Sequence, residues 1–224
     1  MNAPLIFGLI SQAVMVGTVG VWLVRRWSKK CLEKGVPPHS PFSLPWIARP
    51  WASWALALGI GALSLIPLGG TSLCQYLRGF WNDVSPTTLQ LCLLSLAGWQ
   101  WPPRQRLGLL VTTLLGAALL YPTALSNLPL DAYRWGFAAQ APIFLGALVL
   151  LGLLALRGAP ALAVILGLDL FAFGAGLLDG DNLWDYLLDP MLVTYALFTL
   201  GPALAARRRP AAPAPLPHES PHAP

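Results

Sequence analysis

Apolar runs of roughly 20 residues recur along the chain, separated by short segments rich in Arg, Asp, Pro and Trp. A helix of that length crosses the ~30 Å hydrocarbon core of a bilayer. Backbone groups in lipid must be satisfied within their own segment, so these runs are predicted to be helices rather than barrel strands. Charged residues make up 10% of the chain, against about 25% in soluble domains. The sequence therefore predicts a membrane protein.

The pattern predicts an all-α fold, a polytopic transmembrane helix bundle of about seven spans within residues 1–206. The third run is the shortest, and Pro122 interrupts the fourth near its outer end. Six spans with one re-entrant segment are therefore an alternative. The predicted spans are residues 3–24, 51–69, 86–101, 107–124, 137–156, 160–178 and 189–206.

Positive charges predict the orientation of the bundle. With seven spans, alternate loops share a side, and all cations except Arg78 and Arg134 fall on one side. Cytoplasmic loops carry the excess of Lys and Arg, so the N-terminus is predicted outside and the C-terminus inside. Tryptophans fall near the same boundaries, as expected for interfacial rings. The acidic residues on the opposite, outer side are Asp83, Asp131, Asp179, Asp181, Asp185 and Asp189.

The two ends of the chain fit this orientation. The N-terminal "MNAPLIF" lacks Lys and Arg, and "RRWSKK" follows the first apolar run, the reverse of a secretory signal. We therefore expect a retained first helix and residence in the bacterial inner membrane. Residues 207–224 are rich in Pro and Ala without apolar periodicity, which predicts a disordered cytoplasmic tail. The net charge of +5 is assigned to the cytoplasmic edge, and no nucleic-acid partner is expected.

Asp169 is the carboxylate placed deepest in a predicted span, near the middle of the sixth. A charge there costs at least about 2.5–3.5 kcal/mol, so such residues usually face the bundle. Gln12 and Thr199 reach similar depth and are the expected hydrogen-bond partners. Asp169 is interpreted either as a functional group, which binds a proton or cation on a transport path or contacts a substrate head group, or as a protonated side chain that joins helices.

Four carboxylates lie in "LLDGDNLWDYLLDP", residues 177–190. Asp189 before Pro190 is predicted to cap the last helix, and "NLWD" to start a short interfacial turn with Asp185 in it. Trp184 is expected in the headgroup layer. Asp179 and Asp181 are expected in a hydrated turn, with a divalent-cation site as the alternative, although the further ligands of a calcium loop are missing.

Two other outer segments combine an acid, an Arg and aromatics, "LPLDAYRWG" at 128–136 and "YLRGFWND" at 76–83. If the bundle gathers these loops, an outward vestibule could bind a phosphorylated lipid or sugar, with Arg134 as the anion anchor. The alternative is a set of separate interfacial belts with local Arg/Asp pairs. The residues of the vestibule would be Asp131, Arg134, Trp135, Trp184 and Asp185.

Common catalytic signatures are missing from the sequence. The predicted spans contain no His or Lys, and no G-x-S-x-G, P-loop or H-E-x-x-H motif occurs. We therefore expect no cofactor, metal or catalytic residue, and a non-catalytic accessory or scaffold subunit of an envelope or lipid-related process. Its expected partners are the lipid bilayer and other membrane subunits. The alternatives are a small transporter or channel component that uses Asp169, or an outer-face enzyme on a lipid-linked substrate.

Overall fold

The computed structural model of the chain describes residues 3–35, 37, 44, 49–125, 131–137 and 141–207. Side chains are described at these positions except 141 and 202–207. Most of the predicted cytoplasmic loop between residues 36 and 48 lies outside the described residues. The predicted disordered tail, 207–224, also lies outside them except for the backbone of residue 207.

The described chain is all-α apart from one two-strand hairpin, so the predicted fold class is confirmed at that level. One helix overlaps each of the seven predicted apolar runs. Three shorter helical segments, α3, η2 and α8, lie between them. The elements are α1 (Ala3–Glu33), α2 (Pro50–Ser64), β1 (Pro67–Leu68), β2 (Thr71–Ser72), α3 (Leu73–Trp81), α4 (Pro86–Leu96), α5 (Pro103–Leu125), η2 (Ala132–Gly136), α6 (Ala141–Ala155), α7 (Pro160–Gly174), α8 (Leu183–Leu187) and α9 (Pro190–Arg207).

The long helices differ in their reach. Among the described residues, α1 and α5 are the two helices long and apolar enough to cross a membrane by length and composition. The 31 residues of α1 extend about 46 Å, whereas the 11 residues of α4 extend about 16 Å. The number of spans and their orientation therefore stay predictions.

Local sequence signals explain where several helices begin. Proline occupies the first turn of α2, α4 and α7, where its missing N–H needs no partner. Asp189 caps α9, because its carboxylate accepts the backbone N–H of Leu192 at 2.7 Å. Asn182 caps α8 by accepting the N–H of Trp184 at 3.0 Å. The two helix starts predicted for this part of the chain are thus confirmed.

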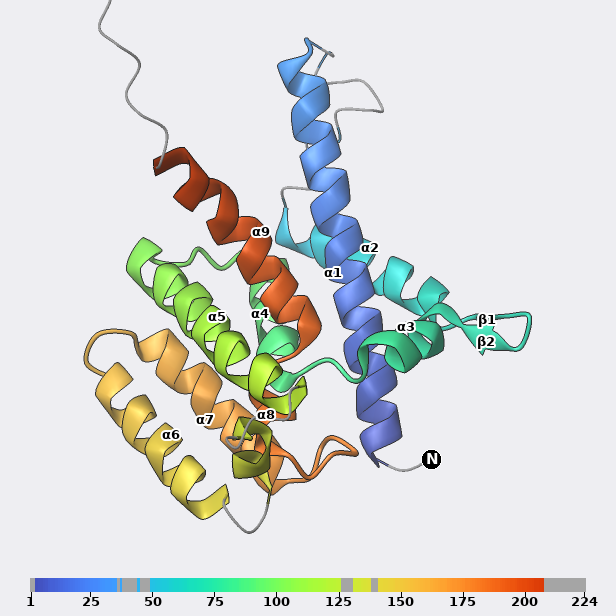
Figure 1. The fold of residues 1–224 in the computed structure, drawn as a ribbon. Helices are drawn as coiled ribbons and strands as arrows, with labels where there is room; N and C mark the ends of the chain where they lie inside the picture. The colour runs from blue at the N-terminus through green and yellow to red at the C-terminus, as the bar shows by residue number, and fades with distance from the viewer. Residues whose placement is uncertain are drawn as a thin grey trace, which may run out of the picture.

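Figure 1 shows α1 and α2 on one side of the molecule and α5, α6, α7 and α9 on the other, with α4 between them. α1 and α2 cross at very close range. A Cβ added to Gly17 would overlap the backbone carbonyl of Ala57, and one added to Gly61 would lie 2.8 Å from the carbonyl oxygen of Ala13. Small residues at these positions therefore allow the two backbones to meet.

The interior is divided into small clusters rather than one large core. The largest joins α5, α8 and α9 through Leu120, Trp184 and Leu192. By contrast, none of the described side chains of α6 is buried, and its Ile143 is 84% exposed. The bundle thus presents an extensive apolar outer surface.

Candidate functional site

The segment 177–190 includes α8 and lies at the lower ends of α5 and α7 in Figure 1. Leu183, Trp184 and Tyr186 are buried. The indole N–H of Trp184 donates to the carbonyl of Ala132 at 2.9 Å, and the side-chain amide of Asn182 donates to the carbonyl of Tyr133 at 2.9 Å. These bonds attach α8 to η2. The ring of Trp184 packs inside the protein rather than on its surface, and its expected depth at the headgroup layer stays a prediction.

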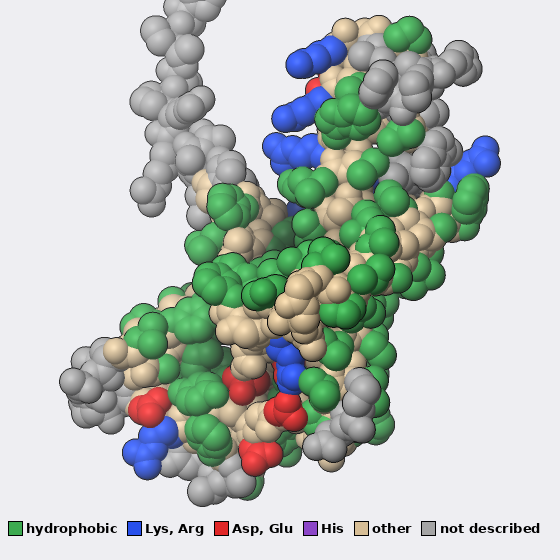
Figure 2. All heavy atoms as spheres, turned by 90° about the vertical axis from the view of Figure 1, so that its right-hand side faces the viewer, with side chains coloured by type: hydrophobic (Ala, Val, Ile, Leu, Met, Phe, Trp, Pro, Cys, Tyr) green, Lys and Arg blue, Asp and Glu red, His purple; other side chains and the backbone are tan. Residues whose placement is uncertain are grey.

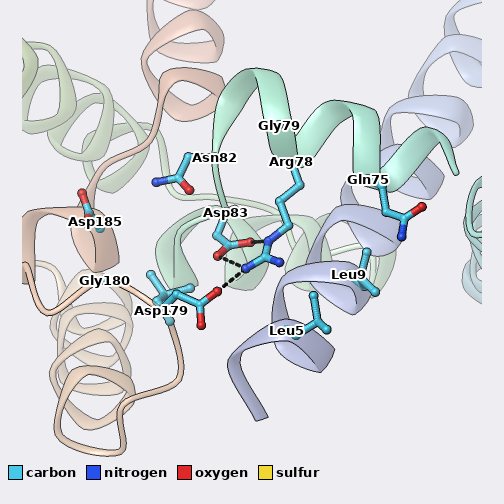
Figure 3. A pocket seen from close by; sticks show the side chains of 11 residues that line it. Leu5, Leu9, Gln75, Arg78, Gly79, Asn82, Asp83, Asp179, Gly180 and Asp185 are labelled. Carbon is cyan, nitrogen blue, oxygen red and sulfur yellow. Dashed lines mark hydrogen bonds and ion pairs between the residues drawn. The ribbon is translucent and has the colours of Figure 1, made fainter. Parts of the chain in front are cut away.

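Arg78 on α3 joins two segments that are distant in the sequence (Figure 3). Its Nε and Nη2 atoms donate to the carboxylate of Asp83 at 2.5 and 3.0 Å. Nη2 also forms an ion pair with Asp179 in the loop before α8. The Asp83 side chain is only 6% exposed, whereas that of Asp179 is 60% exposed. Arg78 therefore holds α3 against the loop between α7 and α8.

The electrostatic environment of Arg78 favours its charged form. The hydrogen bond with Asp83 raises the pKa of Arg78, burial acts in the opposite direction, and Asp179 adds to the rise. Gly8 on α1 faces this ion pair. A Cβ at Gly8 would overlap the Asp83 carboxylate, so the close approach of α1 depends on glycine there.

A cavity of about 440 Å³ opens beside this ion pair. Two leucines of α1, at positions 5 and 9, form its apolar wall opposite the guanidinium in Figure 3. Polar atoms come from α3, from the bend after it and from the segment around α8. The lining residues are Leu5, Leu9, Gln75, Arg78, Gly79, Asn82, Asp83, Leu178, Asp179, Gly180 and Asp185.

Asp185 also lines the cavity, away from the ion pair of Arg78. Its side chain is half-buried, and both of its oxygens lie 3.4 Å from the hydroxyl of Tyr133. Burial raises the pKa of Asp185, the hydrogen bond from Tyr133 lowers it, and the charge of Asp83 raises it further. The cavity therefore disfavours the charge of Asp185.

The remaining outer candidates lie outside the cavity. Asp131 starts η2 by accepting the N–H of Tyr133 at 3.0 Å. Arg134 is exposed and Trp135 is half-buried. Asp181 is exposed and does not line the cavity. The structure thus gathers the predicted outer clusters, but it places Arg78 rather than Arg134 at the cavity.

Asp169 lies elsewhere, buried on α7 at 1% exposure. Its Oδ1 accepts the side-chain amide of Gln90 at 2.7 Å, and its Oδ2 accepts the hydroxyl of Thr87 at 2.6 Å. Both donors belong to α4. Asp169 therefore ties α7 to α4 through both of its oxygens.

The expected partners of Asp169 are wrong. Gln12 is buried and donates to the backbone carbonyl of Asn82 at 2.8 Å, which places its amide beside the bend after α3. Thr199 is half-buried on α9, and no hydrogen bond joins it to Asp169 in the described part of the chain. Counting residues along each predicted span was not enough to identify the partners of Asp169. The count assumes spans of equal length, whereas α4 has 11 residues.

Sequence reasoning missed Arg78, Asp83 and Asn82 as individual residues of the site. A usable signal was present, since Arg78 is one of two cations on the predicted outer side and lies in "YLRGFWND". The backbone of Asn82 has φ +68°, a conformation that non-glycine residues adopt uncommonly. Among the described residues, no group of three His, Cys, Asp or Glu side chains is arranged to hold a metal ion.

Comparisons with known proteins assign no family to the chain. No protein-family model, curated protein or solved structure matches it. The cavity and the buried polar contacts are therefore interpreted from their own geometry.

Proposed function

We propose that the protein is an integral membrane protein whose bundle crosses the bilayer seven times, with its N-terminus outside and its C-terminus in the cytoplasm. The surface of α6 supports this placement. Its 15 residues include no charged side chain, and its described side chains are all at least partly exposed. Such a helix would be a large aggregation-prone patch in water, whereas hydrocarbon is a suitable solvent for it.

The distribution of charge supports the orientation. Figure 2 shows most Lys and Arg of one face at one end of the molecule and most Asp at the other, with hydrophobic side chains between. Arg25, Arg26, Lys29 and Lys30 extend α1 beyond its apolar part, whereas Asp83, Asp179 and Asp185 surround the cavity at the opposite end. The positive-inside rule then places the cavity on the outer side.

The short helix α4 can be one of the seven crossings, although it is shorter than the bilayer core. At about 16 Å it covers half of the hydrocarbon thickness. It packs against α1, α7 and α8, so neighbouring helices shield it from lipid. Irregular backbone at membrane depth is tolerated where protein buries it, and the bend at 82–85, whose residues Asp83, Val84 and Ser85 are buried, meets this condition.

Within the membrane we propose a non-catalytic accessory or scaffold subunit, serving a lipid-related process of the bacterial inner membrane. One observation supports this proposal most directly: two buried carboxylates are hydrogen-bonded to residues of neighbouring elements. Asp169 joins α7 to α4, and Asp189 accepts the backbone N–H and the hydroxyl of Ser85 at 2.8 and 2.6 Å, which joins α9 to the start of α4. Both carboxylates hold helices of the bundle together, which supports a structural role rather than a place on a transport path.

Affinity purification of the full chain from native membranes, followed by gel filtration, tests the scaffold role. We expect a stoichiometric complex with another membrane protein, and the same complex for Asp169→Asn, because Asn can still bond Thr87 and Gln90. The transporter alternative predicts the opposite pattern. A monomer that carries out pH-coupled flux in proteoliposomes, lost in Asp169→Asn, would contradict the proposal.

A further inference from the structure

An exposed apolar surface follows α2 in the chain. Leu68 in the β1–β2 hairpin is 79% exposed, and Tyr76 and Phe80 on α3 are 63% and 75% exposed. Figure 2 views the molecule from the side on which the hairpin projects in Figure 1, and hydrophobic side chains cover most of the middle of this face. The hairpin and the outer side of α3 are together named the platform, whose exposed apolar residues are Ile66, Leu68, Leu73, Tyr76 and Phe80.

The two sides of α3 differ in character. Leu73, Tyr76 and Phe80 are three and four positions apart, which places them on one side of the helix. Gln75 and Arg78 lie on the side that lines the cavity against α1. The side chain of Arg78 is 21% exposed and is paired with two carboxylates there. The helix therefore turns its charged residue toward the protein and an uncharged apolar side outward.

The absence of charge extends well beyond α3. Residues 50–77 contain no Asp, Glu, Lys, Arg or His. This uncharged segment includes α2, which is proposed above to cross the bilayer and whose Leu58 and Leu63 are 65% and 67% exposed. The platform thus extends the apolar surface of α2 beyond the end of that helix. In water such a surface would favour aggregation, whereas lipid is a suitable solvent for it.

The backbone of the platform is suited to a site with little water. β1 and β2 pair with each other, with Pro67 opposite Ser72 and Leu68 opposite Thr71. α3 begins with a capping box, in which Ser72 Oγ accepts the N–H of Gln75 at 3.2 Å and Gln75 Oε1 accepts the N–H of Ser72 at 2.7 Å. Unpaired backbone groups are costly near hydrocarbon, so these internal bonds lower the cost of removing the segment from water.

Contacts with α1 place the platform near one end of the bundle. Gly8 on α1 lies against the ion pair of Arg78 and Asp83, and Gln12 donates to the carbonyl of Asn82 after α3. Figure 1 shows α3 crossing α1 near its N-terminal end, with the hairpin projecting away from the other helices. With the N-terminus outside, as proposed, this level belongs to the outer leaflet. An amphipathic helix in the membrane plane at such a level fits the boundary between head groups and acyl chains.

We propose that the platform inserts into the outer leaflet, with Tyr76 and Phe80 at the boundary between head groups and acyl chains. Its partner is the phospholipid monolayer, which it recognises through apolar area rather than through head-group charge. The inference rests on the membrane placement proposed above and adds a lipid contact outside the crossing helices. Because Gln12 attaches α1 to the bend after α3, insertion of the platform also sets the depth of α1.

Photocrosslinking of the full chain in vesicles of phosphatidylethanolamine and phosphatidylglycerol tests this contact. Leu68 and Phe80 are replaced, one at a time, by p-benzoylphenylalanine, and mass spectrometry measures phospholipid adducts after irradiation. Phe171, 72% exposed on the proposed crossing helix α7, is the membrane control, and Lys29, whose side chain is 80% exposed at the basic end of α1, is the aqueous control. We expect adduct yields at 68 and 80 within about threefold of that at 171 and at least about tenfold above that at 29.

The controls separate failure of the platform from failure of the membrane placement. Gel filtration and thermal unfolding verify that each variant is folded. Adducts at position 171, with yields at 68 and 80 no higher than at 29, would overturn the platform and leave the membrane placement intact. A lack of adducts at 171 as well would contradict the placement itself. In native membranes, adducts of positions 68 and 80 with a protein in place of lipid would identify a subunit interface and overturn the proposal.

Discussion

At the scale of single residues, two buried carboxylates meet the first turns of α4. Asp189 accepts from Ser85, which caps this helix, and Asp169 accepts from Thr87 and Gln90 in its first two turns. A buried polar group is tolerated where its hydrogen bonds are satisfied, and both oxygens of Asp169 accept from side chains of α4. These two donors explain the position of Asp169 in an apolar run.

Asp185 gives a pH dependence that can be measured. Burial raises its pKa, so the folded chain binds more protons than the unfolded chain between the ordinary Asp value, about 4, and the folded value. Stability is then lost as the pH rises through this range. Asp185→Asn cannot ionise, so its melting temperature relative to the unmodified chain should be higher by about 2 °C or more at pH 7 than at pH 4.

The control for this prediction is Asp181→Asn. Its side chain is exposed, so we expect its melting temperature to differ little from that of the unmodified chain at either pH. A difference for Asp185→Asn that is equal at the two pH values would show that its carboxylate is not destabilised in the folded state.

Residues whose partners are close in sequence were predictable, and residues with distant partners were not. Asp189 and Asn182 cap helices within three positions of themselves, so local capping rules were sufficient. Arg78 and Asp179 lie 101 positions apart. Their meeting depends on how α3 and the loop before α8 pack, which no local pattern specifies.

At the scale of elements, apolar run length predicted the seven longer helices but not how they end. α1 continues through "RRWSKK" to Glu33, since these residues are good helix formers once the helix has begun. α8 has five residues, below the length at which periodicity is visible. Its burial follows from tertiary contacts with η2 and α5, so the short interfacial turn expected there is a packed element. Asp179 and Asp181, which were expected in a hydrated turn, lie before it and are exposed.

The crossing of α1 and α2 should be sensitive to added volume. Gly61→Ala would place a Cβ 2.8 Å from the carbonyl oxygen of Ala13. This oxygen belongs to the backbone of α1, so relieving the contact requires a shift of the helix. We expect destabilisation of about 1–3 kcal/mol, seen as a melting temperature lower by about 2–4 °C for each kcal/mol.

Gly59→Ala in the same helix is the matched control. A Cβ at this position meets nothing within 4 Å, so the substitution should be neutral or slightly stabilising. Equal effects of the two substitutions would mean that helix propensity, rather than close packing, determines the response.

At the scale of the whole molecule, the proposed topology depends on how the charges are arranged. A basic end and an acidic end are separated by an apolar surface (Figure 2), and the cavity opens at the acidic end. The seven crossings that we propose would place these ends on opposite sides of the bilayer. If α4 turned back instead of crossing, the segment around residue 180 would lie on the same side as residue 30, and several arginine-bearing loops would face outward against the positive-inside rule.

Reporter fusions or cysteine labelling at residues 30, 180 and 210 test this arrangement most directly. We expect residues 30 and 210 on the cytoplasmic side and residue 180 on the outer side. Residues 30 and 180 on the same side would contradict both the seven-span bundle and the outward position of the cavity.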